Sequence, residues 1–494
     1  MRTFVGRNDL LSRMEREWAS TRDKGEGRMI TVRGRRRVGK TWLVEEFIDR
    51  TEPPNVFFAV SRQTDERELA LFAQTLATST LPSRSQAEGI TFGTWQAALV
   101  SAAAGADAAR PSVIVLDEFP YLLGDTKASR DAVLGAVQTA WDRTLSKQPV
   151  LLVLVGSDRA MMEMITAPKQ PLHQRPNREI FVPPLNPAEA AALSGLTGAD
   201  ALDSYLVTGG FPKVVRAKMD RSLKDFLADQ LADDGTPLVT TGRLILDSEF
   251  GANTQARSIL SVLGEGLRKR GDISGETGID GANIKRPLDF LIDEKRVVEG
   301  RRPLSTATSR DTRYEIVDPF LRFYMRFIDR HRGEIERARG RVVASIVLRD
   351  WSTYRGKAIE AVIRTALDEM IPDARFGDAA SVGAYWTIDN AVEVDLVGAD
   401  RRDPPAKRVS FIGSIKWRDR RPVDQTDHTA LIRSAARVPG TDPAKTRTVA
   451  VSRLGANADA TNVFDAVDRQ RWCPQGGSGT RPLSADDGLA WYAA

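Results

Sequence analysis

The chain has 494 residues, of which 41% are hydrophobic and 28% charged; these are globular proportions that favour several domains and exclude extended disorder. Its 71 basic residues are nearly balanced by 66 acidic ones, so the net charge of +5 favours polyanionic partners only weakly. The single cysteine, Cys473, excludes an intramolecular disulfide, and together with three histidines it argues against a typical zinc site. No run approaches the roughly 20 apolar residues of a membrane span, and no apolar leader follows the N-terminus, so we expect a cytoplasmic location without membrane partners.

Short apolar runs alternate with helical patterns over roughly the first two hundred residues. The expected strands are residues 29–33, 55–60, 112–116 and 150–155, and the expected helices include 42–48 and 132–145. Apolar runs without alternation are typical of strands that are buried on both faces. The pattern therefore predicts an α/β fold with a parallel sheet between helices.

A glycine-rich segment, residues 34–41, reads G-R-R-R-V-G-K-T and fits the phosphate-loop pattern G-x-x-x-x-G-K-[ST] between an expected strand and an expected helix. Backbone N–H groups of such a loop wrap phosphates, and the helix N-terminus adds its positive dipole end. Lys40 would place a charge at the β- and γ-phosphates of ATP, and the Thr41 hydroxyl would bind Mg²⁺. The expected ATP-binding residues of this segment are Gly34, Arg35, Arg36, Arg37, Val38, Gly39, Lys40, Thr41 and Trp42.

A later apolar strand ends in two carboxylates, which is the form of the Walker B motif that accompanies a phosphate loop. Asp117, at the strand's C-terminal edge, can hold Mg²⁺, and Glu118 can orient and deprotonate the attacking water. The next expected strand ends in Gly-Ser-Asp, where Ser157 can contact the γ-phosphate or the water; a simple turn is the alternative. We therefore expect Glu118, Lys40 and Ser157 to be catalytic residues of an ATPase.

With these motifs in place, the first third to half of the chain resembles the archaeal-type ATPase branch of the AAA+ superfamily, close to the STAND signalling NTPases. The resemblance is carried by residues 4–7 (Phe-Val-Gly-Arg), 34–41, 116–119 (Leu-Asp-Glu-Phe), 156–157 and 209–212 (Gly-Gly-Phe-Pro). It implies a P-loop core with a helical lid, ATP and Mg²⁺ as cofactors, and leaves a nucleotide-dependent homo-oligomer or a monomer open.

The resemblance also implies roles for residues outside the two motifs. Val5, Gly6 and Arg7 are expected near the adenine, although the residues alone indicate only a helix-entry turn at Gly6. Arg175 precedes a Pro-Leu step, as does an arginine of the family, and is expected to act as an arginine finger or sensor. A surface arginine is the alternative for Arg175.

From about Pro187 the pattern becomes helical, which predicts a lid domain. Residues 258–316 then follow the order of a winged helix, with two helices around a short segment and two possible wing strands. In the expected helix over 284–294, Lys285 and Arg286 face outward and could enter a major groove. The expected wing contacts to phosphates are Arg301, Arg302 and Arg310. A winged helix that only packs against protein is the alternative.

The C-terminal half resembles the uncharacterised domain that often follows this ATPase type, and its last part is similar to the PD-(D/E)xK nuclease-like fold. The matching residues are Glu360 on a helix, Glu393 and Asp395 on a strand, and Ser414 and Lys416 on the next. A working site needs clustered carboxylates for Mg²⁺ and a nearby lysine. Ser414 replaces one carboxylate, which favours an inactive or feeble nuclease. Glu393 shares a strand face with Asp395 and could compensate.

The leading hypothesis is an ATP-hydrolysing switch that couples nucleotide state to a C-terminal module in contact with duplex DNA. A protein-triggered signalling ATPase without DNA binding is the second hypothesis, and an ATP-gated, Mg²⁺-dependent nuclease is the third. The expected domains are residues 1–186 (P-loop ATPase core), 187–254 (helical lid), 255–320 (winged-helix-like domain) and 321–494 (PD-(D/E)xK nuclease-like domain).

Overall fold

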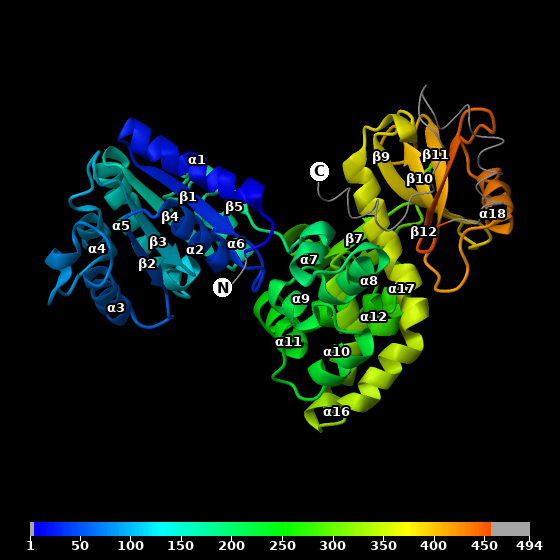
Figure 1. Cartoon of the computed structure of the whole chain (residues 1–494), viewed down its shortest axis with the longest axis horizontal. Coiled ribbons are helices and arrows are strands. Elements are labelled where there is room, and N and C mark those ends of the chain that lie inside the picture. The colour runs from blue at the N-terminus through cyan, green and yellow to red at the C-terminus, as the bar shows by residue number, and fades with distance from the viewer. Residues whose placement is uncertain (1–3, 252, 456–494) are drawn as a thin grey trace. The chain divides into compact units, whose positions relative to one another are not determined.

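A computed structural model describes residues 4–251 and 253–455 of the chain (Figure 1). The chain divides into two compact units, Met1–Pro184 and Leu185–Ala494. Within the described residues, no helix has both the length and the apolar character that crossing a bilayer would require. Cys473 and the expected loop over residues 474–482 lie outside the described residues.

The first unit is a parallel sheet covered by helices, as the sequence predicts. Its strands are β1 (Arg28–Arg33), β2 (Asn55–Ala59), β3 (Ser112–Asp117), β4 (Val150–Gly156) and β5 (Arg178–Phe181). Its helices are α1 (Asn8–Lys24), α2 (Lys40–Thr51), α3 (Asp65–Ala77), α4 (Trp95–Ala103), α5 (Lys127–Arg143) and α6 (Arg159–Ile165), with 3-10 turns η1 (Arg84–Ala87), η2 (Phe119–Leu123) and η3 (Leu145–Lys147). The strand order is β2-β3-β4-β1-β5, and every pairing is parallel. Strand β5 has no counterpart among the strands expected from the sequence.

The strand order brings the expected site together. Strands β3 and β4 are buried along their whole length, as their continuous apolar runs predict. One face of the sheet shares a core with α3, α4 and α5, and right-handed crossovers place α2 on the other face. Because β4 lies between β1 and β3, the C-terminal ends of these three strands are neighbours. The phosphate loop, the two carboxylates and the Gly-Ser-Asp turn all follow these ends.

The second unit begins with the predicted helices. They are α7 (Pro187–Ser194), α8 (Gly198–Thr208), α9 (Pro212–Lys218), α10 (Leu223–Gln230) and α11 (Pro237–Glu249). Later segments return to this bundle as α15 (Pro319–Phe323), π-helix η5 (Tyr324–Ile328), η6 (Asp329–His331) and α16 (Arg332–Glu336). Gly209 has φ +53°, and a Cβ there would lie 2.4 Å from Cβ of Phe320. The Gly-Gly-Phe-Pro break is therefore a close approach of two helical segments that only glycine permits.

A small antiparallel sheet with helices follows in the expected order. Its elements are α12 (Thr254–Gly264), β6 (Arg268–Lys269), α13 (Arg270–Thr277), α14 (Lys285–Asp289), π-helix η4 (Phe290–Glu294), β7 (Val298–Arg301) and β8 (Arg313–Ile316), with strand order β6-β8-β7. The sequence pattern predicts the first of these helices over residues 259–268, but the chain leaves α12 after Gly264 and pairs at β6 with β8. Ile284, Leu288 and Leu291 are buried.

The C-terminal part is a mixed sheet beside a long helix. Its elements are α17 (Gly340–Met370), η7 (Ala374–Phe376), β9 (Ser381–Trp386), β10 (Glu393–Ala399), β11 (Val409–Lys416), α18 (Gln425–Ala435) and β12 (Arg447–Ser452). The strand order is β12-β11-β10-β9, in which β11 and β12 are parallel and the other pairs antiparallel. The expected separate α/β domain at the end of the chain is thus present.

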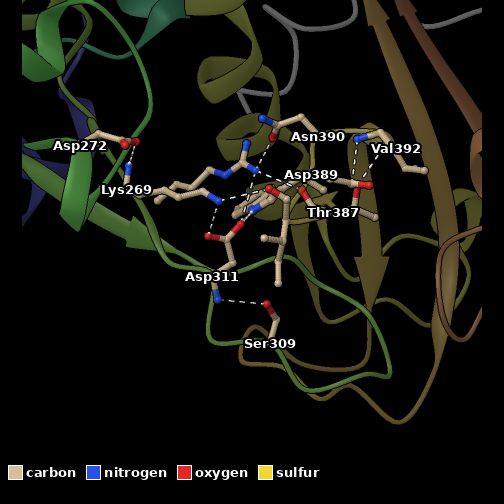
Figure 2. Close-up of polar contacts among 12 residues, drawn as sticks. Lys269, Asp272, Ser309, Asp311, Thr387, Asp389, Asn390 and Val392 are labelled. Atoms are coloured by element: carbon tan, nitrogen blue, oxygen red, sulfur yellow. Dashed lines mark hydrogen bonds and ion pairs between the residues drawn. The ribbon is translucent and has the colours of Figure 1, made fainter.

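Residues 302–312, the connection between β7 and β8, dock onto this C-terminal sheet. Leu304 is buried in its core, and the Leu304 N–H donates to Ala384 O at 2.8 Å. Figure 2 shows Asp311 at the other end of the connection, 3.2 Å from Lys269 Nζ. Asp311 also accepts a hydrogen bond from Trp386 Nε1 at 2.9 Å. The expected wing is therefore a joint between two parts of the second unit.

Candidate nucleotide site

The phosphate loop joins β1 to α2 in a conformation that glycine makes accessible. Gly39 has φ +90°, and a Cβ on Gly34 would lie 2.3 Å from Val182 O. Arg37 adopts a left-handed conformation with φ +64°, which is uncommon for a residue with a side chain. Lys40 is buried, and its Nζ donates to Arg35 O at 3.1 Å. The lysine therefore lies folded over its own loop.

Arg7 braces this loop from the N-terminal segment. Its guanidinium donates to Gly39 O at 3.2 Å, to Val38 O, and to Pro183 O at 3.1 Å. Arg7 is 5% exposed, and the three carbonyls accept hydrogen bonds from its Nη1 and Nη2 groups. Arg7 thus lies at the phosphate loop, and the expected place of Val5, Gly6 and Arg7 near the adenine stays a prediction. The bracing role of Arg7 was missed, because no motif indicates which carbonyls a buried arginine will reach.

Thr41 and Asp117 meet where Mg²⁺ is expected. Thr41 Oγ1 donates to Asp117 Oδ2 at 2.7 Å, and Asp117 is 4% exposed. Burial raises the pKa of Asp117, and the nearby charge of Glu118 adds to this, whereas the Thr41 hydrogen bond opposes it. A buried carboxylate with a raised pKa lacks a sufficient counter-charge, which a cation would supply. The hydroxyl and carboxylate oxygens also suit Mg²⁺, which binds through one or two protein ligands together with nucleotide phosphates.

Ser157 holds Glu118. Ser157 Oγ donates to Glu118 Oε2 at 2.7 Å, and its N–H approaches the same oxygen at 3.2 Å. Glu118 itself has a left-handed backbone, with φ +53°. The next residue, Asp158, accepts from Met161 N–H at 2.9 Å and caps α6. The two polar residues of the Gly-Ser-Asp turn therefore have different contacts: Asp158 caps the helix, and Ser157 bonds to the expected base.

Arg175 does not join these residues. Its Nε and Nη2 donate to the two carboxylate oxygens of Asp142, at 2.9 and 2.8 Å. Two residues later, Asn177 N–H donates to Met29 O near the beginning of β1, whereas the phosphate loop follows the end of that strand. The Arg175 guanidinium is thus held by a carboxylate at the opposite edge of the sheet, and its expected role as an arginine finger or sensor stays a prediction.

Three of the nuclease-like residues, Glu360, Glu393 and Asp395, lie near one another, and the guanidinium of Arg364 contacts two of them. Arg364 donates to Glu360 Oε2 at 3.4 Å and to Asp395 O at 3.2 Å. Burial raises the pKa of Glu360 to about 7, and Asp395 and Glu393 add to this, while Arg364 opposes it. Asp395 Oδ2 accepts from Ile415 N–H at 2.7 Å. Among the described residues, no group of three or more Asp, Glu, His or Cys is arranged to hold a metal ion.

Two of the expected DNA-contacting arginines are engaged within the protein. Arg301 pairs with Glu299 at 2.9 Å and with the buried Glu315 at 3.1 Å. Arg302 pairs with Asp403 of the C-terminal part at 3.2 Å. Phosphate contacts by Arg301 and Arg302 stay predictions; Arg301 is engaged with the buried Glu315, whereas Arg302 and its partner Asp403 are both exposed. Lys285, Arg286 and Arg310 are exposed.

Two family models match separate parts of the chain. Residues 22–161 match an AAA domain family. Residues 324–428 match DUF234, a family described as archaeal and bacterial proteins of unknown function. An uncharacterized protein of Methanocaldococcus jannaschii is 22% identical over 420 residues, which cover 84% of this chain and 88% of that protein. These matches confirm the expected combination of an AAA+ type P-loop ATPase domain with a characteristic C-terminal domain.

Two solved structures are similar over most of their own length. The Walker-type ATPase PABY2304 of Pyrococcus abyssi matches with 17% identity and a TM-score of 0.44, covering 66% of this chain and 99% of that chain. The ORC2 protein of Aeropyrum pernix matches with 13% identity and a TM-score of 0.46, covering 70% of this chain and 98% of that chain. The fold assignment rests on the strand order and motifs described above.

Proposed function

We propose that this chain binds ATP with Mg²⁺ and hydrolyses it at the C-terminal ends of β1, β3 and β4. The observation that supports this most is the pairing of Thr41 with Asp117 at 2.7 Å and of Ser157 with Glu118 at 2.7 Å, beside a loop that fits the phosphate-binding pattern. These four side chains thus gather at one edge of the sheet, at or after the ends of β1, β3 and β4.

Each residue has a distinct task in this proposal. The loop N–H groups and Lys40 bind the phosphates, and Thr41 and Asp117 hold the cation. Mg²⁺ neutralises phosphate charge when it is bound with the nucleotide. Glu118 accepts the proton of the attacking water, and Ser157 orients the Glu118 carboxylate through its hydroxyl. Arg7 keeps the loop in shape by binding its carbonyls.

The ATPase proposal is tested with matched variants of the full chain. Glu118→Gln keeps the size of the side chain but removes the base, so it should bind ATP normally and release phosphate at least about a hundredfold more slowly. Lys40→Ala should weaken ATP binding itself. Turnover by Glu118→Gln at the wild-type rate would refute the assignment of the base.

We further propose that nucleotide state is coupled to duplex DNA through the second unit. Lys285 and Arg286 support this, because both are exposed at the N-terminal end of α14 while the apolar face of that helix is buried. A helix so presented can enter a major groove with basic residues at its N-terminal end. Since Arg301 and Arg302 are engaged in the joint, α14 would supply the main contact.

Salt dependence of duplex binding tests the DNA proposal. Replacing both Lys285 and Arg286 with alanine should weaken binding and reduce the slope of log affinity against log salt by about one to two units. Lys224→Ala, which removes an exposed cation from α10, is the matched control and should leave that slope unchanged. No binding by the wild type at low ionic strength would favour a protein-triggered ATPase instead.

A further inference from the structure

The side chain of Arg36 connects the phosphate loop to the turn that carries Glu118. Its Nη2 donates to the hydroxyl of Tyr121, and its Cζ lies 5.8 Å from the centroid of the Tyr121 ring. Tyr121 belongs to η2, and its N–H donates to Glu118 O at 2.9 Å. A cation of the loop is thus held by the turn that begins at the proposed base, whereas Lys40 is folded over the loop itself.

The turn that contacts Arg36, η2, is fixed in place by buried residues. Phe119 is fully buried, Pro120 is buried beside it, and Glu118 enters the turn with a left-handed backbone. Proline limits backbone freedom, and buried neighbours prevent the turn from shifting. Tyr121 therefore presents its ring and hydroxyl to Arg36 from a fixed position, close to where the attacked phosphate must lie if Glu118 activates the water.

The bond between Arg36 and Tyr121 is of a kind that a phosphate can replace. A phenol hydroxyl is a neutral acceptor with a single oxygen, whereas a phosphate carries the opposite charge and can accept two parallel N–H bonds from one guanidinium. A guanidinium carries five N–H donors in a fork that matches phosphate oxygens. The contact with the face of the Tyr121 ring does not use these donors and can persist in the bound state.

We infer that the Arg36 side chain binds the terminal phosphate of the nucleotide and makes the site prefer a triphosphate to a diphosphate, with Tyr121 as the positioning residue. This inference rests on the proposed ATP site. The loop N–H groups serve the phosphates that both nucleotides share. Arg36, held at the turn that follows Glu118, contributes binding energy only when a terminal phosphate is present. It therefore distinguishes ATP from ADP.

Equilibrium binding to the full chain tests the inference without any turnover. Dissociation constants are measured with Mg²⁺ for ADP and for a non-hydrolysable ATP analogue. Arg36→Ala should weaken binding of the analogue about tenfold or more, and binding of ADP by no more than about twofold. Arg36→Lys should recover part of the loss, because it restores the charge without the fork. Tyr121→Phe should cause a smaller loss in the same direction.

Arg62 provides the matched control. Its Cζ lies 5.6 Å from the same ring, but it belongs to the segment after β2 and its side chain is 69% exposed. Arg62→Ala should therefore leave both dissociation constants within about twofold of the wild-type values. Equal weakening of both nucleotides by Arg36→Ala, or an equal loss in Arg62→Ala, would overturn the inference. A wild type that binds neither nucleotide would instead refute the ATP site itself.

Discussion

The buried carboxylate of Asp117 connects stability to ligand binding. Its raised pKa means that the folded chain disfavours the charged form relative to the unfolded chain. This penalty is absent at pH values below the pKa that Asp117 has in the unfolded chain. It is fully present once the pH exceeds the pKa that Asp117 has in the folded chain. Without ligand and at neutral pH, the carboxylate is therefore a source of instability that a bound cation would remove.

Asp117→Asn should stabilise the ligand-free protein at neutral pH and abolish its stabilisation by Mg²⁺ and ATP. We expect the first unit to melt a few degrees higher, at about 2–4 °C for each kcal/mol gained. Thermal unfolding of both proteins, with and without Mg²⁺ and ATP, measures both effects. Equal stabilisation of the variant and the wild type by ligand would contradict the role of Asp117.

Glu315 is a buried carboxylate of the opposite kind. Burial alone would raise its pKa, but Arg301, Arg364 and Arg322 together hold the pKa below its ordinary value. These guanidiniums lie 3.1, 3.7 and 3.5 Å from its oxygens. A depressed pKa contributes stability that is present above the unfolded pKa and is lost as the pH falls through the folded pKa.

Glu315→Gln should destabilise the second unit by about 3–5 kcal/mol at neutral pH, because three buried guanidiniums lose their shared charge partner. The loss should shrink as the pH falls from neutrality through the pKa of Glu315 in the folded chain, where the wild type also loses this contribution. Urea midpoints across that pH range measure the difference. A destabilisation that does not depend on pH would contradict the assigned charge pairing.

At the scale of elements, the connection between β7 and β8 has a testable structural role. Asp311 is 9% exposed in its side chain and bonds to Lys269 and Trp386. Asp311→Asn keeps the shape but removes the charge, so residues 302–312 should exchange amide hydrogens faster, with a loss of about 1–3 kcal/mol. Asp272→Asn, which changes an exposed neighbour of the same lysine, should have little effect. Unchanged exchange in Asp311→Asn would contradict the joint.

Motifs and apolar runs allowed most of the first unit to be predicted. The phosphate loop and Asp117 stand at the ends of runs whose burial on both faces makes them recognisable as strands. Strand β5 was missed because it is short, with only one buried residue in Arg178–Phe181. Local patterns also could not show that Arg301 turns inward, because its partner Glu315 comes from another strand.

At the scale of the whole molecule, the second unit contains a direct tie between its helical bundle and its C-terminal sheet. Asp203 of α8 accepts from Trp417 Nε1 at 2.7 Å and from Arg355 Nη1 of α17 at 2.9 Å. Trp417 follows the end of β11 directly. A shift of the bundle would therefore move α17 and the sheet with it. This is the behaviour expected if the second unit responds to nucleotide state as a rigid body.

The most direct test of nucleotide turnover coupled to DNA is the rate of Mg²⁺-dependent phosphate release with and without duplex DNA. The full-length wild type is compared with the Lys285→Ala, Arg286→Ala double variant, and Glu118→Gln gives the background. We predict that duplex DNA raises the wild-type rate and leaves the double variant at its basal rate. A wild-type rate above background that is indifferent to DNA would contradict the coupling, and a rate equal to background would contradict the ATPase itself.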